Sequence, residues 1–513
     1  MKNYRSNPSA HPATGSPNGY HATAAQTHGS PDGYHAAAPH GSPNGYRIAP
    51  SPTGYVHLGT VAMAVVNSYL ARQNGGRFYL RIEDTDGKRY VADAVPKMMQ
   101  TFQYFGIEFT ETYVQSERAA IYQQYAHDLV KQGKAYYCFC TEDDLTKMRE
   151  TQIKNNEPTG YYGKYARCRH LSADEVKRRV DAGEPYVIRA NFGFQDWGER
   201  ITFTDAARGE IALPPQTNDP IILKSNGLPP YNFAHVIDDT LMGTALVVRG
   251  EEWLISTAEH MQLCDLLGFP RLRYLHMPTI NIEDNGKKRK LSKRKDPQAL
   301  VMNLVDAGYP RDAIFEYLLT IYNSDFEIWR TAHPEAPLTD FQFSLNKIGT
   351  NNPLFDLPKL NDIAKNVWAR YDHKTIVKMF NDWNWQSLPG ITPAIKTRIE
   401  GMLGVERGGE RPRKDLVKFE DIPTLYSYVW DKIDVDAKDL DGALLKSYAA
   451  IYDDHDDKDT WWQKIKDMAP DKPALRNLTA QIRLAVTGKT NTPDLWAICR
   501  VLGNDIVKAR LTR

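Results

Sequence analysis

The segment Pro50–Thr60, with the sequence PSPTGYVHLGT, carries side chains suited to binding a nucleotide. Its pattern predicts a short strand, a Pro/Gly-rich turn and then a helix. A helix begins with unpaired N–H groups and a positive partial charge, which favour a polyphosphate. At this start, Gly59 allows a nucleotide to approach the backbone closely, and His57 can donate a hydrogen bond to a phosphate. A histidine that caps a helix is also common without any ligand, so this segment alone leaves both interpretations open.

A second segment, Lys287–Lys295, holds seven basic residues in nine (KKRKLSKRK) and lies far downstream of the first. Such a run is typical of a solvated basic loop or of a nucleic-acid contact. It also suits a loop in which Lys290 and Lys293 close over a triphosphate and stabilise the departing pyrophosphate. Taken together, the two segments indicate chemistry on a nucleoside triphosphate.

A third group consists of Cys138 and Cys140, followed by Cys168 and His170. Three sulfurs and one imidazole suit a tetrahedral Zn²⁺ site, and we expect these four residues to be its ligands. The alternative is two buried cysteines, an isolated third cysteine and a surface histidine. With five cysteines in 513 residues, the chain has no disulfide framework.

The segments HLGT (57–60) and KLSKR (290–294) resemble the paired HIGH and KMSKS signatures of class I aminoacyl-tRNA synthetases. The surrounding sequence narrows this resemblance to bacterial glutamyl-tRNA synthetases. The blocks that carry it are RIAPSPTGYVHLGT (47–60), LRIEDTD (80–86), LPPYNFAHVIDD (228–239), VVRGEEW (247–253) and KLSKRK (290–295). The resemblance covers about residues 47–513, because RLAVTGKTNTPDL (483–495) is similar to the helical anticodon-binding region of that family.

This resemblance implies a ligase that activates glutamate with ATP and Mg²⁺ and then esterifies the 3′-terminal adenosine of tRNA(Glu). It also implies that tRNA binds before glutamate is activated, that tRNA(Gln) is a candidate second acceptor, and that the protein is a monomer. The implied catalytic residues are His57, Lys290 and Lys293. The implied ATP-binding residues are Pro50, His57, Gly59, Thr60, Lys290, Ser292 and Lys293. The implied glutamate-binding residues are Arg47, Ala49, Ser51, Glu83, Tyr231 and Arg249.

The charged members of the glutamate-binding set match the charges of that amino acid. Arg47 and Arg249 can each offer a forked contact to a carboxylate, while Glu83 can pair with the ammonium group. The sequence does not decide which arginine binds which carboxylate. Where the family usually has threonine, this chain has Pro230, which removes a backbone donor and a hydroxyl group beside Tyr231.

Other functions share parts of this pattern. A glutaminyl-tRNA synthetase shares the fold but has a β-rich anticodon region, and a truncated relative that glutamylates a tRNA base lacks an anticodon domain. A nucleotidyltransferase would not need the long C-terminal region, and an inactive tRNA-binding paralogue would not need His57, Lys290 and Lys293. In the family that the chain resembles, only some members hold zinc, within the insertion that contacts the acceptor end of tRNA.

The elements that must position these residues follow from hydrophobic patterning. Helices are predicted up to about residue 71 after the first turn, and near 91–105 and 117–132. Strands are predicted at 47–49, 78–82, 187–190, 221–224, 233–237 and 245–248. This alternation predicts an α/β fold with a Rossmann-type parallel sheet that an insertion interrupts. Beyond about residue 300 helical periodicity dominates, and we expect the seven tryptophans from Trp368 onward to pack in helix cores.

Six segments follow from these patterns and from the resemblance. We expect a disordered low-complexity tail at 1–46 and the first half of the Rossmann-type catalytic domain at 47–124. An inserted acceptor-binding and zinc domain follows at 125–228, and the second catalytic half at 229–290. All-α stem-contact and anticodon-binding domains are expected at 291–375 and 376–513.

Residues 1–46 contain no Leu, Ile, Val, Phe or Trp and cannot bury enough apolar surface to offset the entropy of ordering. Three S-P-x-G-Y copies there, beginning at Ser16, Ser30 and Ser42, share the pattern of Ser51–Tyr55 but lack the helix that follows it. The formal net charge of +1 means that any RNA contact depends on local patches. No apolar run approaches 18 residues and no signal-peptide core occurs, so we expect no membrane span and a cytoplasmic location.

Overall fold

The structure is a computed structural model that describes residues 43–54, 56–86, 91–193, 199–291, 295–297, 300–408 and 411–513. The predictions for residues 1–42 of the tail, for Ser292 and for Lys293 lie outside the described residues. Within the described part of the chain, no helix combines the length and the hydrophobicity that crossing a membrane requires.

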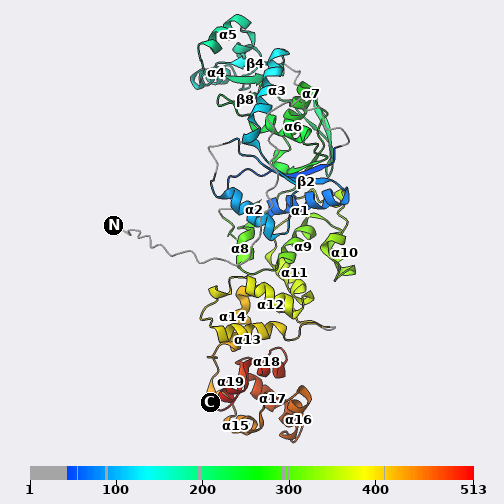
Figure 1. Ribbon diagram of the computed structural model, residues 1–513, viewed down its shortest axis with the longest axis vertical. Coiled ribbons are helices and arrows are strands. Elements are labelled where there is room, and N and C mark those ends of the chain that lie inside the picture. The colour runs from blue at the N-terminus through cyan, green and yellow to red at the C-terminus, as the bar shows by residue number, and fades with distance from the viewer. Residues whose placement is uncertain are drawn as a thin grey trace, which may run out of the picture. The chain divides into compact units, whose positions relative to one another are not determined.

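A parallel sheet opens the folded chain. It contains β1 (Gly45–Ile48), β2 (Arg77–Ile82) and β3 (Glu111–Val114) in that order, with Arg47 opposite Tyr79 in the register. β2 is buried almost along its whole length, as expected for a parallel strand with both faces covered. The connections between the strands contain α1 (Leu58–Gln73) and α2 (Ala94–Tyr104), which Figure 1 shows beside β2.

A second set of strands extends this sheet. Its order is β7-β6-β10-β9, in which β10 runs parallel to both β6 and β9, and β6 and β7 form an antiparallel pair. The bounds are β6 (Ile201–Asp205), β7 (Gly209–Leu213), β9 (Val247–Gly250) and β10 (Tyr274–Met277). A bridge between Gly45 and Thr244 joins β1 to the segment before β9, and the Gly45 N–H donates to the Gly243 carbonyl at 2.8 Å. The carboxyl ends of β1 and β9 therefore meet at one edge, and the predicted α/β fold with a parallel sheet is confirmed.

A separate antiparallel sheet has the order β4-β5-β8. It consists of β4 (Ala135–Cys138), β5 (Val187–Ala190) and β8 (Ile221–Leu223). Its helices are α3 (Ala119–Lys131), α4 (Glu142–Lys154) and α5 (Ala173–Asp181). α4 begins at a capping box, in which the Thr141 side chain and Asp144 each bond the other's backbone N–H.

One predicted strand is wrong. Residues 233–237 lie inside α6 (Tyr231–Leu241), which packs beside α7 (Thr257–Leu267). Seven consecutive residues of α6, from Phe233 to Asp239, are buried. Its sequence therefore lacks the helical spacing of polar residues that marks an exposed helix face. A short, fully buried helix cannot be distinguished from a buried strand by periodicity alone.

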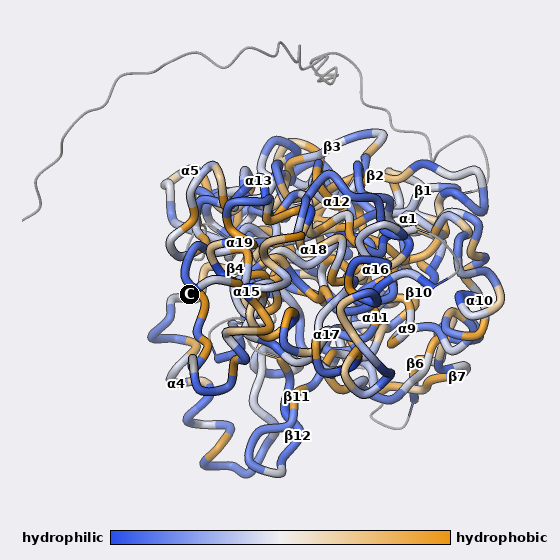
Figure 2. Tube along the Cα trace, turned by 90° about the horizontal axis from the view of Figure 1, so that it is seen from below, coloured by the Kyte–Doolittle hydropathy of each residue, from blue (hydrophilic) through white to orange (hydrophobic). Residues whose placement is uncertain are grey.

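Beyond the sheets, the chain forms an antiparallel hairpin of β11 (Asn281–Asp284) and β12 (Lys287–Lys290), which Figure 2 shows as mostly hydrophilic. β12 is the last strand among the described residues. The helices that follow are α8 (Val301–Asp306), α9 (Arg311–Tyr322), α10 (Phe326–Ala332), α11 (Leu357–Arg370), α12 (His373–Asp382), α13 (Pro393–Gly404), α14 (Ile422–Leu425), α15 (Gly442–Ile451), α16 (Lys458–Asp467), α17 (Lys472–Thr487), α18 (Leu495–Leu502) and α19 (Asn504–Leu511).

The sheet region and the C-terminal helices each have a large hydrophobic core of their own. The first extends from β1 to Val367 on α11, and the second begins at the next residue, Trp368, and extends to Leu511. Trp368 and Trp461 are buried in the second core, and the other five C-terminal tryptophans pack against it or against its rim. The prediction that these tryptophans form helix cores is therefore confirmed.

Candidate functional site

His57 occupies the position directly before α1. Its backbone is extended, and its Nδ1 accepts a hydrogen bond from the Thr60 N–H at 3.2 Å, so the ring caps the helix. With Nδ1 acting as acceptor, the ring proton is on Nε2, which lies 3.5 Å from the Thr60 hydroxyl oxygen. A side chain on Gly59 would crowd the imidazole, because an added Cβ would lie 3.0 Å from His57 Cε1. The sequence and the fold together place an imidazole and a glycine backbone at this helix start.

A cavity joins this helix start to the basic hairpin. Lys290, at the end of β12, lines it together with His57 and Gly59. The other lining residues are Met63, Gly250, Glu252, Met277, Pro278, Thr279, Ile280, Leu291 and Tyr322. The Lys290 ammonium is 2.8 Å from Glu252 Oε1, and both side chains are about half exposed. The structure therefore brings together three of the predicted ATP-binding residues around one cavity.

The remaining ATP-binding candidates are placed differently. Pro50 does not line the cavity, and its carbonyl accepts a hydrogen bond from the Glu83 N–H at 3.1 Å. Thr60 lies in the first turn of α1, half-buried. Ser292 and Lys293 lie outside the described residues.

Arg47, on β1, is buried and already has a carboxylate partner. Its Nε donates to Asp239 Oδ1 at 2.9 Å, its Nη2 to Asp239 Oδ2 at 3.3 Å, and its Nη1 to the Val248 carbonyl at 3.0 Å. One fork of the guanidinium is thus bound to Asp239 on α6. Two of the five N–H groups of Arg47 remain for a ligand, so the forked contact that the sequence suggested is only partly available.

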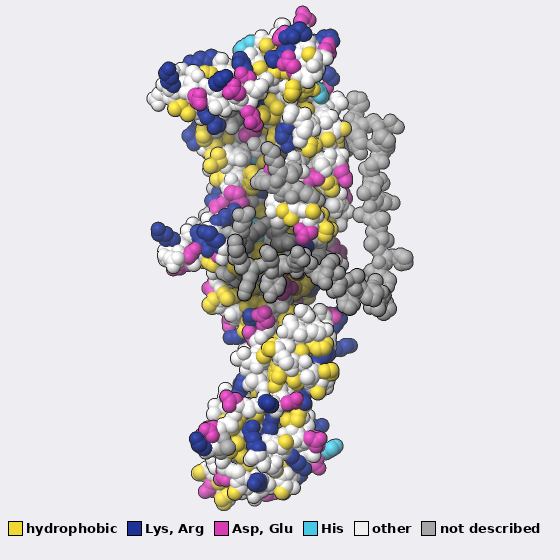
Figure 3. Space-filling model, turned by 90° about the vertical axis from the view of Figure 1, so that its left-hand side faces the viewer, with side chains coloured by type: hydrophobic (Ala, Val, Ile, Leu, Met, Phe, Trp, Pro, Cys, Tyr) yellow, Lys and Arg dark blue, Asp and Glu magenta, His cyan; other side chains and the backbone are white. Residues whose placement is uncertain are grey.

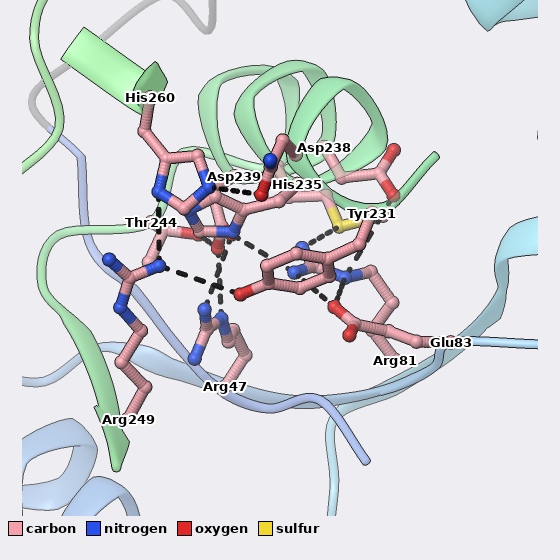
Figure 4. A network of polar contacts seen from close by, with 12 residues as sticks. Arg47, Arg81, Glu83, Tyr231, His235, Asp238, Asp239, Thr244, Arg249 and His260 are labelled. Carbon is pink, nitrogen blue, oxygen red and sulfur yellow. Dashed lines mark hydrogen bonds and ion pairs between the residues drawn. The ribbon is translucent and has the colours of Figure 1, made fainter. Parts of the chain in front are cut away.

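The proposed ammonium partner, Glu83, belongs to a buried network of charges (Figure 4). Arg81 donates to Glu83 Oε1 at 3.0 Å and to Asp239 Oδ2 at 2.9 Å. Burial raises the pKa of the Glu83 carboxyl group, although Arg81 and Arg47 act in the opposite direction. Glu83 is therefore held in a fixed position by Arg81, close to the carboxyl end of β1.

Arg249, on β9, has all five N–H groups directed at protein acceptors. Nε donates to His276 at 3.0 Å and Nη1 to His260 at 3.1 Å, while the Nη1 contact to the Tyr231 hydroxyl is long, at 3.5 Å. The Nη2 group donates to the Thr257 hydroxyl and to the Trp253 carbonyl. Figure 4 shows Arg249, Tyr231 and Arg47 directed toward the same space between β1, β9 and α6. Ala49 and Ser51 follow β1 directly at this edge.

The three cysteines of the predicted zinc site lie together, but His170 does not join them. The sulfur atoms of Cys138, Cys140 and Cys168 lie within 4.8 Å of one another, whereas His170 ends a 3-10 turn with an exposed side chain. The hydroxyl of Tyr161 is instead 3.4 Å from Cys138 Sγ and 3.3 Å from Cys140 Sγ. Hydrogen bonds from Cys140 and Cys168 lower the pKa of the Cys138 thiol. These four residues place three sulfurs and one oxygen around one point.

Comparisons with known proteins show the family to which the chain belongs. Residues 45–338 match the family described as tRNA synthetases class I (E and Q), catalytic domain, and residues 418–513 match an anticodon binding domain. A glutamate–tRNA ligase of Acetivibrio thermocellus is 39% identical over 91% of this chain and 93% of its own length. One from Clostridium perfringens is 36% identical over the same shares. The chain belongs to the class I tRNA synthetases for glutamate and glutamine.

A solved synthetase shares this fold. The glutamate tRNA ligase of Elizabethkingia meningosepticum, in complex with its amino acid, has a TM-score of 0.76 at 24% identity and covers 92% of this chain and 98% of its own. The C-terminal part of the synthetase described here contains helices and no strand after β12 among its described residues, unlike the β-rich region expected of a glutaminyl enzyme. β1 begins at Gly45, inside the segment 1–46 that was predicted as a disordered tail, and Gly45 and Tyr46 are buried. The other domain boundaries predicted from sequence remain predictions.

Sequence patterns missed several residues that contact the predicted glutamate-binding residues of this synthetase. Arg81, Asp238 and Asp239 form its buried ion pairs, and His260 and His276 contact Arg249. One signal was present, because two consecutive aspartates inside the apolar stretch FAHVIDD need buried partners. The two histidines lie in different elements and gave no such signal.

Proposed function

We propose that this chain is a glutamate–tRNA ligase that forms glutamyl-adenylate and then transfers glutamate to the 3′-terminal adenosine of tRNA(Glu). The observation that carries the proposal is the meeting of two sites at one sheet edge. A cavity with His57 and Lys290 lies where β1 leads into α1, and the donors of Arg249 and Tyr231 lie at the ends of β9 and α6. The relatives named above are themselves glutamate–tRNA ligases.

In the first step, a carboxylate oxygen of glutamate attacks the α-phosphorus of ATP, and pyrophosphate leaves. The nucleophile is already ionised, so the protein needs no general base and acts by positioning and charge stabilisation. His57 donates its Nε2 proton to a phosphate oxygen, and Lys290 and Lys293 neutralise the charge that develops on the pyrophosphate. Mg²⁺ carried with ATP supplies further neutralisation when it is bound.

Lys290 must exchange partners for this step. In the structure its ammonium group is paired with Glu252, at the rim of the cavity. Exposed pairs of this kind contribute about 1 kcal/mol or less, so a triphosphate with several negative charges can displace the carboxylate.

In the second step, the 2′-hydroxyl of the terminal adenosine takes the glutamyl group and AMP leaves.

The amino-acid site separates the two kinds of charge on glutamate. Arg249 and the remaining N–H groups of Arg47 lie where they can bind carboxylates, and Glu83 lies near β1 as the ammonium partner. Ala49 and Ser51 would line the same edge. Pro50, Gly59, Thr60 and Ser292 complete the proposed ATP set.

Zn²⁺ fits the cysteine cluster when the fourth ligand is changed. Three thiols and the Tyr161 hydroxyl converge on one point, and sulfur with oxygen is an acceptable donor set for tetrahedral zinc. We therefore propose Cys138, Cys140, Cys168 and Tyr161 as the ligands, with His170 outside the set. A bound Zn²⁺ would hold β4 against the turn at Arg167–His170 and so fix the inserted segment that we propose contacts the acceptor end of tRNA.

The face of the molecule in Figure 3 shows acidic and basic side chains interspersed among the described residues. We propose that tRNA contacts come from local patches along the chain, with tRNA(Gln) as a candidate second acceptor. By family resemblance, we propose that the enzyme acts as a cytoplasmic monomer.

Glutamate-dependent exchange of pyrophosphate into ATP, measured with and without tRNA(Glu), tests the proposal. We expect exchange only when glutamate and tRNA are both present, and repeating the transfer assay with tRNA(Gln) measures the range of acceptors. Exchange supported by glutamine rather than glutamate would contradict the assignment.

Lys293→Ala should reduce the exchange rate by orders of magnitude without affecting folding, because Lys293 is assigned to the leaving pyrophosphate. Lys288→Ala is the matched control, since Lys288 is an exposed lysine of β12 that does not line the cavity. Equal rates in the two variants would remove Lys293 from the proposed mechanism.

A further inference from the structure

The two histidines that face Arg249 have fixed protonation states. Arginine carries only donors, so the imidazole nitrogen directed at it must be an acceptor without a proton. The proton of His276 is therefore on Nδ1, 2.7 Å from Asp205 Oδ2, because its Nε2 faces Arg249. The proton of His260 is on Nε2, 2.9 Å from Asn232 Oδ1, because its Nδ1 faces Arg249. The two rings are neutral and are opposite tautomers.

Their surroundings maintain this neutral state. Both side chains are completely buried, and burial lowers the pKa of each imidazole. A proton added to either ring would place one N–H against another and a second cation beside Arg249. Asp205, which faces His276 from β6, accepts hydrogen bonds from both the ring and the backbone of His276 and so fixes the ring's orientation.

These contacts leave Arg249 only one position from which it can reach a ligand. Of its five N–H contacts, the one to the Tyr231 hydroxyl is the longest, at 3.5 Å, while the others lie between 2.8 and 3.1 Å. A carboxylate that approaches between Nη1 and the Tyr231 hydroxyl breaks only this weak contact. The histidines, Thr257 and Trp253 continue to hold the guanidinium.

We propose that His260 and His276 are positioning residues that hold Arg249 in place to bind a carboxylate of glutamate and to disfavour glutamine. The inference rests on the proposed function, because it takes glutamate as the substrate. The ligand meets two donors, Nη1–H and the Tyr231 O–H, and a carboxylate supplies only acceptors. A glutamine side chain has one acceptor oxygen in place of two, so it cannot accept from both groups in the way a side-chain carboxylate does, and a fixed Arg249 cannot turn to compensate.

Substitutions that restore one acceptor atom provide the test. His276→Leu removes the acceptor, and we expect the glutamate KM to rise roughly 10- to 100-fold, as for loss of one hydrogen bond to a charged group. The KM for ATP should not change. His276→Gln should restore glutamate binding because its Oε1 replaces Nε2, and His276→Asn should not because it is too short.

The opposite pattern is expected at the other histidine. His260→Leu should raise the glutamate KM, and here Asn should restore it because its Oδ1 replaces Nδ1, whereas Gln should not. The His260 variants still test the proposal if His276→Leu fails to fold. Leu263→Ala is the stability control: it opens a cavity on the same helix, α7, and should lower the melting temperature without changing the glutamate KM.

The measurement is tRNA-dependent pyrophosphate exchange, with glutamate, glutamine and ATP varied separately. A glutamate KM that stays at the wild-type value in both Leu variants would overturn the proposal. So would a parallel rise of the ATP KM, or rescue by Asn and Gln alike at both positions, because these indicate a general structural role. A wild-type protein without glutamate-dependent exchange would instead refute the proposed function itself.

Discussion

At the scale of single residues, buried charges dominate the proposed amino-acid site. Arg47, Arg81 and Arg118 pair with Glu83, Asp238 and Asp239, so three cations balance three carboxylates. Desolvating these groups is costly, and only complete pairing offsets the cost. The network therefore stays intact only if every member is present.

Arg81→Met tests this balance. The side chain of Arg81 is completely buried, so its removal leaves Glu83 and Asp239 with an uncompensated charge, and we expect a loss of about 3–5 kcal/mol in the free energy of unfolding. Arg77→Met, on the same strand, is the control, because Arg77 is 39% exposed and pairs with Glu111 at the surface. That change should cost about 1 kcal/mol or less in a urea titration. Equal losses in the two variants would contradict the argument.

A second residue-scale prediction concerns the metal. Tyr161→Phe removes the hydroxyl beside the three cysteines, and we expect zinc to be lost to a competing chelator at least about tenfold faster than from the wild type. His170→Ala should retain zinc like the wild type, because the His170 side chain is exposed and lies outside the cluster. Mass spectrometry of the bound metal measures both variants. Zinc loss in His170→Ala but not in Tyr161→Phe would restore the ligand set predicted from sequence.

At the scale of elements, α6 organises the site. Tyr231, His235 and Asp239 are spaced by four residues and lie along one face, which is directed at Arg47 and Arg249. Asp238 lies on the adjacent face and accepts hydrogen bonds from Arg118, Gln115 and Tyr122. A single buried helix thus connects the sheet to the helix α3.

The stability of α6 should depend on pH. Burial lowers the pKa of His235 to about 3, whereas an unfolded histidine titrates near 6.5. When the helix opens, His235 therefore takes up a proton at any pH between its folded and unfolded pKa values. The free energy of opening is highest above about pH 6.5 and falls by about 1.4 kcal/mol for each pH unit below that. Hydrogen exchange of the α6 amides between roughly pH 6 and 4.5, corrected for intrinsic rates, measures this slope.

His235→Gln is the matched variant, because glutamine does not titrate in this range. It should reduce the slope by about 1.4 kcal/mol per pH unit. Asp239 does not contribute to this slope, because Arg47 and Arg81 overcome the effect of burial and hold its pKa well below its usual range. An unchanged slope in the variant would show that His235 is not the group that takes up the proton.

At the scale of the whole molecule, two hydrophobic cores share one helix. α11 contributes Leu360, Ala364 and Val367 to the core of the sheet region, and Trp368 to the core of the C-terminal helices. Each core is extensive enough to support cooperative unfolding of its own part. We therefore expect two thermal transitions in calorimetry.

Cavity-forming substitutions should assign these transitions. Leu318→Ala lies in the first core and Ile399→Ala in the second, and each should destabilise its own part by about 2–5 kcal/mol. We expect the two variants to shift different transitions. A single transition shifted equally by both would mean that the cores unfold as one unit.

The sequence by itself determined the features that depend on neighbouring residues. The strand–turn–helix at Pro50–Thr60, the resemblance to the synthetase family, the cysteine cluster and the helical C-terminal half all follow from local patterns. The structure then confirmed the parallel α/β sheet and the tryptophan cores. Caps, turns and periodicity depend on residues a few positions apart, so they can be predicted from the sequence alone.

Only the tertiary structure decided which groups meet. Residues 233–237 lie in α6, where consecutive buried residues hide the helical periodicity. Part of the Arg47 guanidinium is bound to Asp239, 192 positions away. The cysteine cluster lies beside Tyr161 rather than His170, and Arg249 is held by histidines from α7 and β10. Hydrogen-bond partners and burial are properties of packing between distant segments, and they decide which donors remain for a substrate.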